Sequence, residues 1–268
     1  MSLFVLFYAY AVSTDCPNLI QFAYNLGIQL NQPNIWSQLQ VNCCGASGIS
    51  CLNQRVTEID WAAMNLDGNI NGTAIPVTVT KLFLFNNVLN GTIPSDLPSG
   101  LASLALDNNK LTGKIPLSLP AGLKMLHASG NSLSGDLPIF PLTLDHLMLG
   151  YPGRHPNQLT GTLRLNSPIE IYINDNWITD VVVQDSSHID PSSCDLSNNP
   201  LYGNPNILSL TVCIKNGLYN ASSLPNTLIS TSTANKGSLA TASQPIPTQS
   251  ISARLDQQLL VLILLFKW

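Results

Sequence analysis

Apolar and polar residues follow the same pattern in three successive stretches of the chain. The stretches read LFLFNNVLNGTIP at 82–94, LALDNNKLTGKIP at 104–116 and LHASGNSLSGDLP at 126–138. Each has apolar residues at its first, third and eighth positions, Asn at the sixth, Gly at the tenth and Pro at the last. The stretches repeat with a period of about 22 residues, and a fixed period of this size predicts a solenoid of stacked coils.

The residue types within one stretch predict the path of one coil. Leu104 and Leu106 alternate with outward positions, which predicts a short strand with two inward side chains. Asn109 follows, and its amide can bond backbone groups of neighbouring coils that would otherwise be buried without partners. Leu111 packs inward, and Gly113 allows the bend that begins the return path. One coil cannot cover its own apolar face, so the coils must stack.

Weaker copies extend the array in both directions. Upstream, Ile59, Trp61, Leu66 and Gly68 fit the pattern, although Met64 replaces the Asn. Downstream, three copies are defined by Leu147, Leu149, Asn157, Leu159 and Gly161, by Ile171, Ile173, Asn176 and Ile178, and by Cys194, Leu196, Asn199, Leu201 and Gly203. The first of these carries about five extra residues within 150–157. We therefore predict about seven repeats between residues 57 and 206.

With its Gly and Ile-Pro positions, the repeat resembles the plant-type class of leucine-rich repeats. The stretch CCGASGISCLNQRVTEIDW at 43–61 is similar to the paired-cysteine cap that precedes such arrays, with Ala46 where the family has Trp. Upstream, Leu19, Ala23, Leu26 and Leu30 have helical spacing, as the cap helix of that family would. The resemblance covers roughly residues 16–206.

This resemblance implies an α/β-type repeat solenoid. Its leucine-rich repeats would form a right-handed superhelix with a parallel concave β-sheet, a convex side mostly of loops and 3-10 turns, and an N-terminus capped by disulfides. The resemblance also implies the pairs Cys16–Cys43 and Cys44–Cys51. Receptor-like ectodomains, co-receptors, polygalacturonase-inhibiting proteins and wall proteins share this fold, so the resemblance specifies the fold but not the function.

The two remaining cysteines lie at the end of the array. The step of ten residues from Gly161 to Ile171, applied to Gly203, leads to Cys213. Cys194 and Cys213 would then lie roughly one strand spacing apart, about 4.8 Å, which allows a disulfide. Two buried free thiols are the alternative. For the cysteines near the N-terminus the competing interpretation is a zinc site, but no His lies nearby at ligand spacing.

The ends of the chain differ from the repeats in composition. Residues 1–13 are apolar and end in small residues, which predicts a signal peptide, with a buried first helix as the alternative. Residues 14–56 form the cysteine cap with its helix, and 207–220 a C-terminal cap. Residues 221–253 are rich in Ser and Thr and predict a disordered stalk. Residues 254–268 end in an apolar run.

The apolar run at the C-terminus is too short to span a bilayer, which requires about 20 residues. We expect a lipid-anchor signal. A truncated transmembrane segment and a short hydrophobic terminus are the alternatives. With the signal peptide, this places the protein outside the cell, either secreted or attached to the cell surface. Sequons at Asn71, Asn90 and Asn220 predict N-glycosylation, because the first two follow an inner apolar residue in an exposed turn.

Composition and motifs argue against catalysis. A charged fraction of 10% and a net charge of −4 provide no basic face for nucleic acid. The sequence has no metal-binding H-E-x-x-H pattern, nucleophile elbow or phosphate loop. The acidic residues Asp60, Asp107, Glu170, Asp175 and Asp195 fall at different strand positions, as solvated surface acids do. We expect no enzyme, no cofactor and no bound metal.

The concave face of such a solenoid exposes the positions that flank the two inner residues. The first column comprises Asp60, Phe83, Ala105, His127, Met148, Tyr172 and Asp195, and the second Ala62, Phe85, Asp107, Ser129, Gly150, Asn174 and Ser197. Together they predict an apolar ligand-binding stripe of Phe83, Phe85, His127, Met148 and Tyr172. The alternative is that these side chains only cover the sheet. The insertion adds Tyr151, Arg154 and His155 as a second candidate site.

These features favour a recognition module at the cell surface or outside the cell. Its partner would be an extracellular protein, a peptide or a neutral glycan, and a membrane-anchored co-receptor would carry any signal onward. An inhibitor of extracellular wall-degrading hydrolases is a second hypothesis, which rests on the family resemblance alone. A structural wall or adhesion protein is the third.

Overall fold

The computed structural model describes residues 13–187, 189–201, 210, 213 and 214. The chain divides into two units, 1–223 and 224–268, and all described residues lie in the first. Several predicted segments lie outside the described residues: 1–12 of the signal peptide, most of the C-terminal cap, the Ser/Thr-rich stalk, the hydrophobic tail and the sequon at Asn220. Within the described part, no helix is long and apolar enough to cross a membrane.

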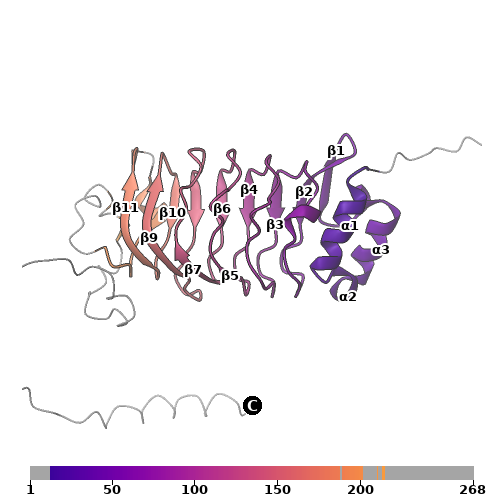
Figure 1. The fold of residues 1–268 in the computed structure, drawn as a ribbon, viewed down its shortest axis with the longest axis horizontal. Coiled ribbons are helices and arrows are strands. Elements are labelled where there is room, and N and C mark those ends of the chain that lie inside the picture. The colour runs from indigo at the N-terminus through magenta and orange to yellow at the C-terminus, as the bar shows by residue number, and fades with distance from the viewer. Residues whose placement is uncertain (1–12, 188, 202–209, 211–212, 215–268) are drawn as a thin grey trace, which may run out of the picture. The chain divides into compact units, whose positions relative to one another are not determined.

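Three helices form the N-terminal end of the solenoid (Figure 1). They are α1 (Cys16–Asn25), α2 (Ile28–Asn31) and α3 (Pro33–Val41). Helix α1 buries Leu19, Phe22 and Ala23, which lie on one face at helical spacing. Phe22 stacks on Trp61 of the first coil, with 6.1 Å between ring centroids. The helices therefore cover the apolar face that the first coil would otherwise expose.

One residue of the predicted cap helix, Leu30, lies outside helix α1 and is exposed. Leu30 was expected on the buried face, but its side chain is 78% exposed. The reason is Gly27, which adopts the left-handed conformation (φ 76°) and ends the first helical segment. Helix α2 starts after it as a separate helix, so the helical spacing from Leu26 to Leu30 is interrupted.

The concave sheet has eight strands in the order β1-β2-β3-β4-β6-β8-β10-β12. Their bounds are β1 (Ile49–Leu52), β2 (Arg55–Asp60), β3 (Lys81–Phe83), β4 (Ser103–Ala105), β6 (Met125–His127), β8 (His146–Met148), β10 (Glu170–Tyr172) and β12 (Cys194–Asp195). Strand β1 is antiparallel to β2, and each later strand pairs in parallel with the one before it. The register aligns the inner residues Leu82, Leu104, Leu126 and Leu147, all of them buried. The predicted parallel sheet is confirmed.

A ladder of asparagines joins the coils behind this sheet. Asn109 donates from Nδ2 to the carbonyl oxygens of Leu84 and Leu106, both at 3.0 Å, and its Oδ1 accepts from the Leu89 amide at 3.0 Å. Equivalent bonds are made by Asn87, Asn131, Asn157, Asn176 and Asn199. The neutral amide thus satisfies buried backbone groups of two coils at once, as the sequence predicted.

The residue before the ladder asparagine has a left-handed backbone in several coils. Asn86, Asn108 and Asn198 have φ between 52° and 57°, and Gly130 takes the same place with φ 66°. Because Asn and Gly tolerate this region better than other residues, the paired Asn-Asn of the repeat has a backbone cause.

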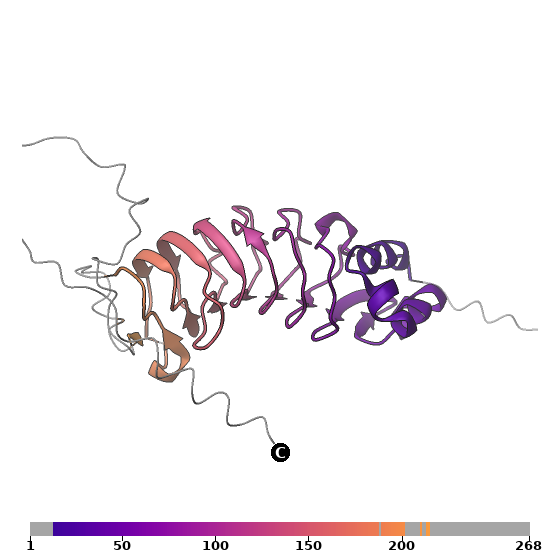
Figure 2. The same cartoon turned by 90° about the horizontal axis from the view of Figure 1, so that it is seen from below.

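A second, four-stranded parallel sheet runs along another side of the coils (Figure 2). It has the order β11-β9-β7-β5, with β5 (Thr112–Gly113), β7 (Ser132–Asp136), β9 (Gln158–Leu165) and β11 (Trp177–Val183). The early coils have loops and a 3-10 turn, η2 (Gly72–Ala74), as expected, and further short 3-10 turns are η1 (Cys43–Gly45) and η3 (Pro191–Ser193). The sequence predicted a convex side mostly of loops and 3-10 turns. In the later coils this prediction must be corrected, because residues 158–165 and 177–183 form strands that bury Leu159, Leu163, Leu165, Ile178 and Val181.

Three disulfides fix the two ends of the array. They join Cys16 to Cys43, Cys44 to Cys51, and Cys194 to Cys213, with Cα–Cα distances of 5.5, 5.6 and 5.1 Å. These are the pairs expected from the sequence. The amide of Leu196 also donates to the Cys213 carbonyl oxygen at 2.8 Å, so Cys213 lies beside the last coil of the concave sheet.

An ion pair ties the cap to the first two coils. The Asp15 carboxylate accepts from Arg55 at 2.9 Å twice, from the Val56 amide at 2.9 Å and from the Thr78 hydroxyl at 2.9 Å. Burial acts to raise the pKa of Asp15, but these hydrogen bonds outweigh it and hold the pKa below its usual value. The charged form is therefore the one that the fold stabilises.

Candidate functional site

A groove lies on the concave sheet, where five coils present residues side by side. The register aligns Asp60, Phe83, Ala105, His127 and Met148 on β2, β3, β4, β6 and β8. The buried leucines occupy the alternate positions of the same strands, so these side chains face away from the core. The geometry of the repeat thus gathers residues that are far apart in the sequence onto one surface.

The groove has a volume of about 630 Å³. It is lined by Asp60, Phe83, Phe85, Asn86, Ala105, Asp107, Met125, His127, Met148, Tyr151 and Arg154. Four of the five residues of the predicted stripe therefore meet in it, together with two residues of the insertion. The fifth stripe residue, Tyr172, lies on β10 and adjoins the groove through Tyr151, with ring centroids 5.4 Å apart.

The exposed surface is narrower than the sequence predicted. In the first column Ala105 and Asp195 are buried, and in the second column only Ala62 and Phe85 keep partial exposure. The expectation of exposure was wrong for the other members of the second column, which are Asp107, Ser129, Gly150, Asn174 and Ser197. Small polar residues at this place bond to one another: Asp107 Oδ1 accepts from the Ser129 amide at 3.0 Å and from its hydroxyl at 2.5 Å.

The insertion leaves the asparagine ladder intact. Asn157 donates to the Leu149 carbonyl oxygen at 2.8 Å across eight residues, where Asn109 donates to Leu106 across three. The difference is the five extra residues. They begin at Gly150, where a Cβ atom would collide with the carbonyl oxygen of Asn174, so the insertion leaves the strand at a place that requires glycine.

The insertion places an aromatic and cationic cluster at the end of the groove. The Arg154 guanidinium carbon lies 5.4 Å from the centroid of the Tyr151 ring, within the range of a cation–π contact. The Tyr172 hydroxyl donates to the Ser192 carbonyl oxygen at 2.8 Å. Burial, followed by the nearby charge of Glu170, raises the pKa of Tyr172, so the phenol stays neutral at physiological pH.

His127 is the histidine that lines the groove. Its Nδ1 lies 3.9 Å from Asp107 Oδ2 and its Nε2 lies 3.9 Å from Glu170 Oε2. Burial lowers the pKa of His127 and outweighs the opposing effect of the two carboxylates, so the imidazole is neutral at pH 7. Its Nε2 is buried without a hydrogen-bond partner among the described residues, and the same holds for Arg154 Nη1.

His155, the third insertion residue predicted for the site, does not line this groove. It lies in a separate pocket of about 360 Å³ with Gln158, Asp175, Trp177 and Asn198. Its Nδ1 is 3.2 Å from the carbonyl oxygen of Asn131, which directs the ring toward the preceding coil. The insertion therefore contributes Tyr151 and Arg154 to the concave face but not His155.

Both described sequon asparagines directly follow a buried apolar residue, Ile70 before Asn71 and Leu89 before Asn90. Asn90 is exposed, and its Nδ2 donates to the Asp67 carbonyl oxygen at 2.9 Å. Asn71 is partly exposed and accepts from the amide and hydroxyl of Thr73 at 3.2 and 2.8 Å. Neither asparagine lines the concave groove.

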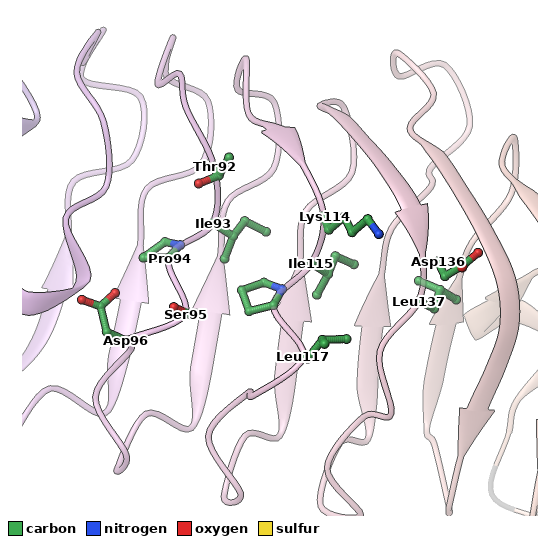
Figure 3. A pocket seen from close by; sticks show the side chains of 11 residues that line it. Thr92, Ile93, Pro94, Ser95, Asp96, Lys114, Ile115, Leu117, Asp136 and Leu137 are labelled. Carbon is green, nitrogen blue, oxygen red and sulfur yellow. The ribbon is translucent and has the colours of Figure 1, made fainter.

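A second groove, of about 620 Å³, lies on another side of the coils (Figure 3). Ile93, Ile115 and Leu137 occupy equivalent positions of three successive coils there, with Leu117 beside them. Figure 3 shows Lys114 extending toward Asp136 along its rim. Among the described residues, none that lines this second groove has a buried side-chain nitrogen or oxygen without a hydrogen-bond partner. The concave groove differs, because His127 and Arg154 each have such an atom. Across the described ranges, no group of three or more His, Cys, Asp or Glu residues could hold a metal ion.

No family model and no curated protein matches the chain. Solved structures do match it. The BIR3–SERK2 complex from Arabidopsis thaliana is 28% identical over 54% of this chain and 82% of that chain, with a TM-score of 0.44. Pollen Receptor Kinase 3 is 22% identical over 65% of this chain and 95% of that chain, with a TM-score of 0.46. A plant ice-binding protein is 20% identical over 69% of this chain and 86% of that chain, with a TM-score of 0.39.

The repeat geometry decides the class of the fold. Inward leucines on parallel strands, the asparagine ladder and a paired-cysteine cap are present together. The chain folds as a leucine-rich repeat solenoid whose repeat resembles the plant-type class. Its concave groove adds two features that stacking the coils does not require: Phe83 and Phe85, at the end of β3 and just after it, and the insertion after β8.

Sequence reasoning missed Met125 and Asn86 as lining residues. Met125 precedes the inner leucine of its strand, in a third column with Lys81, Ser103, His146 and Glu170. This column could have been found by extending the same register one position toward the start of each strand. Asn86 could be found only from its left-handed backbone, which turns it toward the groove at the end of β3.

Proposed function

We propose that this leucine-rich repeat solenoid is an extracellular recognition module that binds a protein or peptide segment through its concave groove. The observation that carries the proposal is the apolar groove in which His127 Nε2 and Arg154 Nη1 are buried without partners. A buried polar group left without a hydrogen bond costs about 1–3 kcal/mol. A ligand that bonds these two groups would recover this free energy.

The surrounding side chains suit such a ligand. Phe83, Phe85 and Met148 supply apolar area, and aromatic anchors dominate the binding free energy of protein interfaces. The groove volume of about 630 Å³ is in the range of ligand sites. The ladder asparagines bond buried backbone groups of neighbouring coils. Of the five buried side-chain atoms without a partner among the described residues, His127 Nε2 and Arg154 Nη1 are the two that belong to residues lining the groove.

The disulfides support a location outside the cell. Three disulfides among six cysteines are typical of proteins that fold in an oxidising compartment, and they leave no free thiol. Together with the apolar N-terminal segment, they favour a secreted or surface-attached protein.

The test is a crosslinking capture from cell-surface extract with the full chain, its Phe83→Ala/Phe85→Ala variant and a matched control. The control, Val77→Ala/Leu117→Ala/Ile139→Ala, removes apolar side chains that are 71%, 83% and 81% exposed outside the concave groove. All three proteins are first compared in thermal stability.

We expect one partner to be captured by the wild type and the control and lost from the Phe83→Ala/Phe85→Ala variant. Equal capture by all three proteins would refute recognition through the concave groove. Loss from the control alone would assign recognition to the opposite side of the coils.

A further inference from the structure

The charges of the concave groove specify which kind of peptide fits it, given the proposed recognition function. Most charged groups on this face already have a partner. Lys81 pairs with Glu58 at 3.2 Å, and His146 contacts Asp145 at 2.7 Å. Asp107 bonds Ser129 and lies near His127, which also faces Glu170. Lys81 and Glu58 neutralise each other, Glu170 does not line the groove, and the Asp107 carboxylate is buried and accepts from Ser129, so these groups offer little charge to a ligand.

Apart from the buried Asp107, two charged lining residues have no ion-pair partner among the described residues. Asp60 is exposed at the end of β2, where its Oδ1 accepts only from the Ala62 amide at 3.3 Å. Arg154 rests on Tyr151 at the other end, with Nη1 buried and unbonded. The groove is therefore acidic at its N-terminal end and basic at its C-terminal end.

The distance between the two ends sets the length of the ligand. Asp60, Phe83, Ala105, His127 and Met148 lie on five adjacent strands. Strands are about 4.8 Å apart, so the four intervals span roughly 19 Å. An extended peptide rises roughly 3.3 Å per residue, which corresponds to about six residues. Phe83, Phe85 and Met148 line the path between the two charges.

We propose that the groove binds an extended segment of about six residues with apolar side chains in its middle, a cationic group at Asp60 and an anionic group at Arg154. This inference rests on the proposed function and adds the charge pattern of the ligand. Complementary charges at both ends would fix the direction of the segment, because the reverse orientation would juxtapose like charges.

The probe that tests this pattern is a displayed library of random linear decapeptides, selected in parallel against the full chain and four variants. Arg154→Glu and Asp60→Lys each reverse one end of the groove. Phe83→Ala/Phe85→Ala removes its apolar floor. Lys114→Glu makes the same change of charge as Arg154→Glu, but on an exposed residue of the second groove.

The wild type and the Lys114→Glu variant should enrich peptides with one basic and one acidic residue separated by about four apolar or neutral residues. Arg154→Glu should enrich peptides that are basic at both ends, and Asp60→Lys peptides that are acidic at both ends. A synthetic peptide of the wild-type consensus should bind Arg154→Glu at least about tenfold more weakly, as the reversal of a contacting charge predicts.

The possible failures are distinguishable. Apolar peptides that depend on Phe83 and Phe85 but share no charge pattern, or one pool common to all charge variants, would overturn this inference and leave the proposed function standing. No enrichment above the Phe83→Ala/Phe85→Ala variant would overturn both. A neutral oligosaccharide that binds wild type and charge variants equally, in place of any peptide, would also overturn the inference.

Discussion

The regular coil at 104–116 and the coil that carries the insertion differ in length but not in how they are held. In the first, Asn109 lies three residues after Leu106, and in the second, Asn157 lies eight residues after Leu149. Both asparagines still bridge two coils. The ladder therefore fixes the coil, while the number of residues between the inner leucine and the asparagine can vary. In this protein that variation supplies Tyr151 and Arg154 to the concave groove.

The largest loss of stability is expected when the asparagine ladder is broken in either of these two coils. Asn109→Ala leaves buried carbonyl and amide groups without partners, and we expect a loss of about 4 kcal/mol in the free energy of unfolding. Asn157→Ala should cost a similar amount, because its bonds are equivalent. Denaturant titration measures both. A loss at Asn109 with none at Asn157 would mean that the longer coil is held in another way.

A slightly smaller effect is expected at the C-terminal end of the array. Cys194→Ala/Cys213→Ala removes a disulfide across 19 residues, which should lower the unfolding free energy by about 3 kcal/mol. The measurement is denaturant titration of the double variant beside the oxidised wild type. Unchanged stability would show that the last coil does not depend on this crosslink.

The cap differs from the coils in relying on a charge, so it should respond to pH. Asp15→Asn should lower the unfolding free energy by about 2 kcal/mol at pH 7, since it weakens charge-assisted hydrogen bonds. The folded-state pKa of Asp15 is depressed. Its stabilisation is therefore complete above the unfolded-state pKa of about 3.9 and is lost as the pH falls through the lower folded-state pKa.

Stability measured against pH checks this contrast. The difference between wild type and Asp15→Asn should shrink below pH 4, whereas the penalty of Asn109→Ala should stay constant because an amide does not titrate. A difference for Asp15→Asn that is the same at pH 3 and pH 7 would rule out the charged carboxylate as the cause.

The smallest effect on stability, with a large effect on binding, is expected from shortening the insertion. Replacing 151–156 with a single Asn keeps Gly150 and restores the spacing of the regular coil from Leu149 to Asn157. Loop length changes stability only slowly, so the loss should stay below about 1 kcal/mol. Peptide or partner binding should fall at least tenfold, because Tyr151 and Arg154 are gone. Binding equal to that of the wild type would remove the insertion from the site.

Much of the fold follows from the sequence because its residues have few alternatives. The spacing of Leu104, Asn109 and Gly113 matches one coil, and the step from Gly203 to Cys213 places the last disulfide. The second sheet did not follow, because residues such as 158–165 continue as a strand only when neighbouring coils offer backbone partners. Leu30 was misplaced because the left-handed Gly27 interrupts the helix.

The sequence predicted which residues of the candidate site share one surface, but not how deeply each of them is buried. Periodicity places Phe83, His127 and Met148 on one surface, and the structure brings them into one groove. The burial of Asp107 and Ser129 depends on the bonds that they make to each other, which periodicity does not contain. The direction of His155 likewise depends on the path of the insertion around the coil.

The most direct test of recognition through the concave groove replaces either Phe85 or Leu117 by a photoreactive phenylalanine analogue in the full chain. Each variant is then irradiated in cell-surface extract. Phe85 lines the concave groove, whereas Leu117 is 83% exposed and lines the second groove. We predict a crosslinked partner from position 85 and none from position 117. A partner crosslinked from position 117 alone, or equally from both positions, would contradict the account.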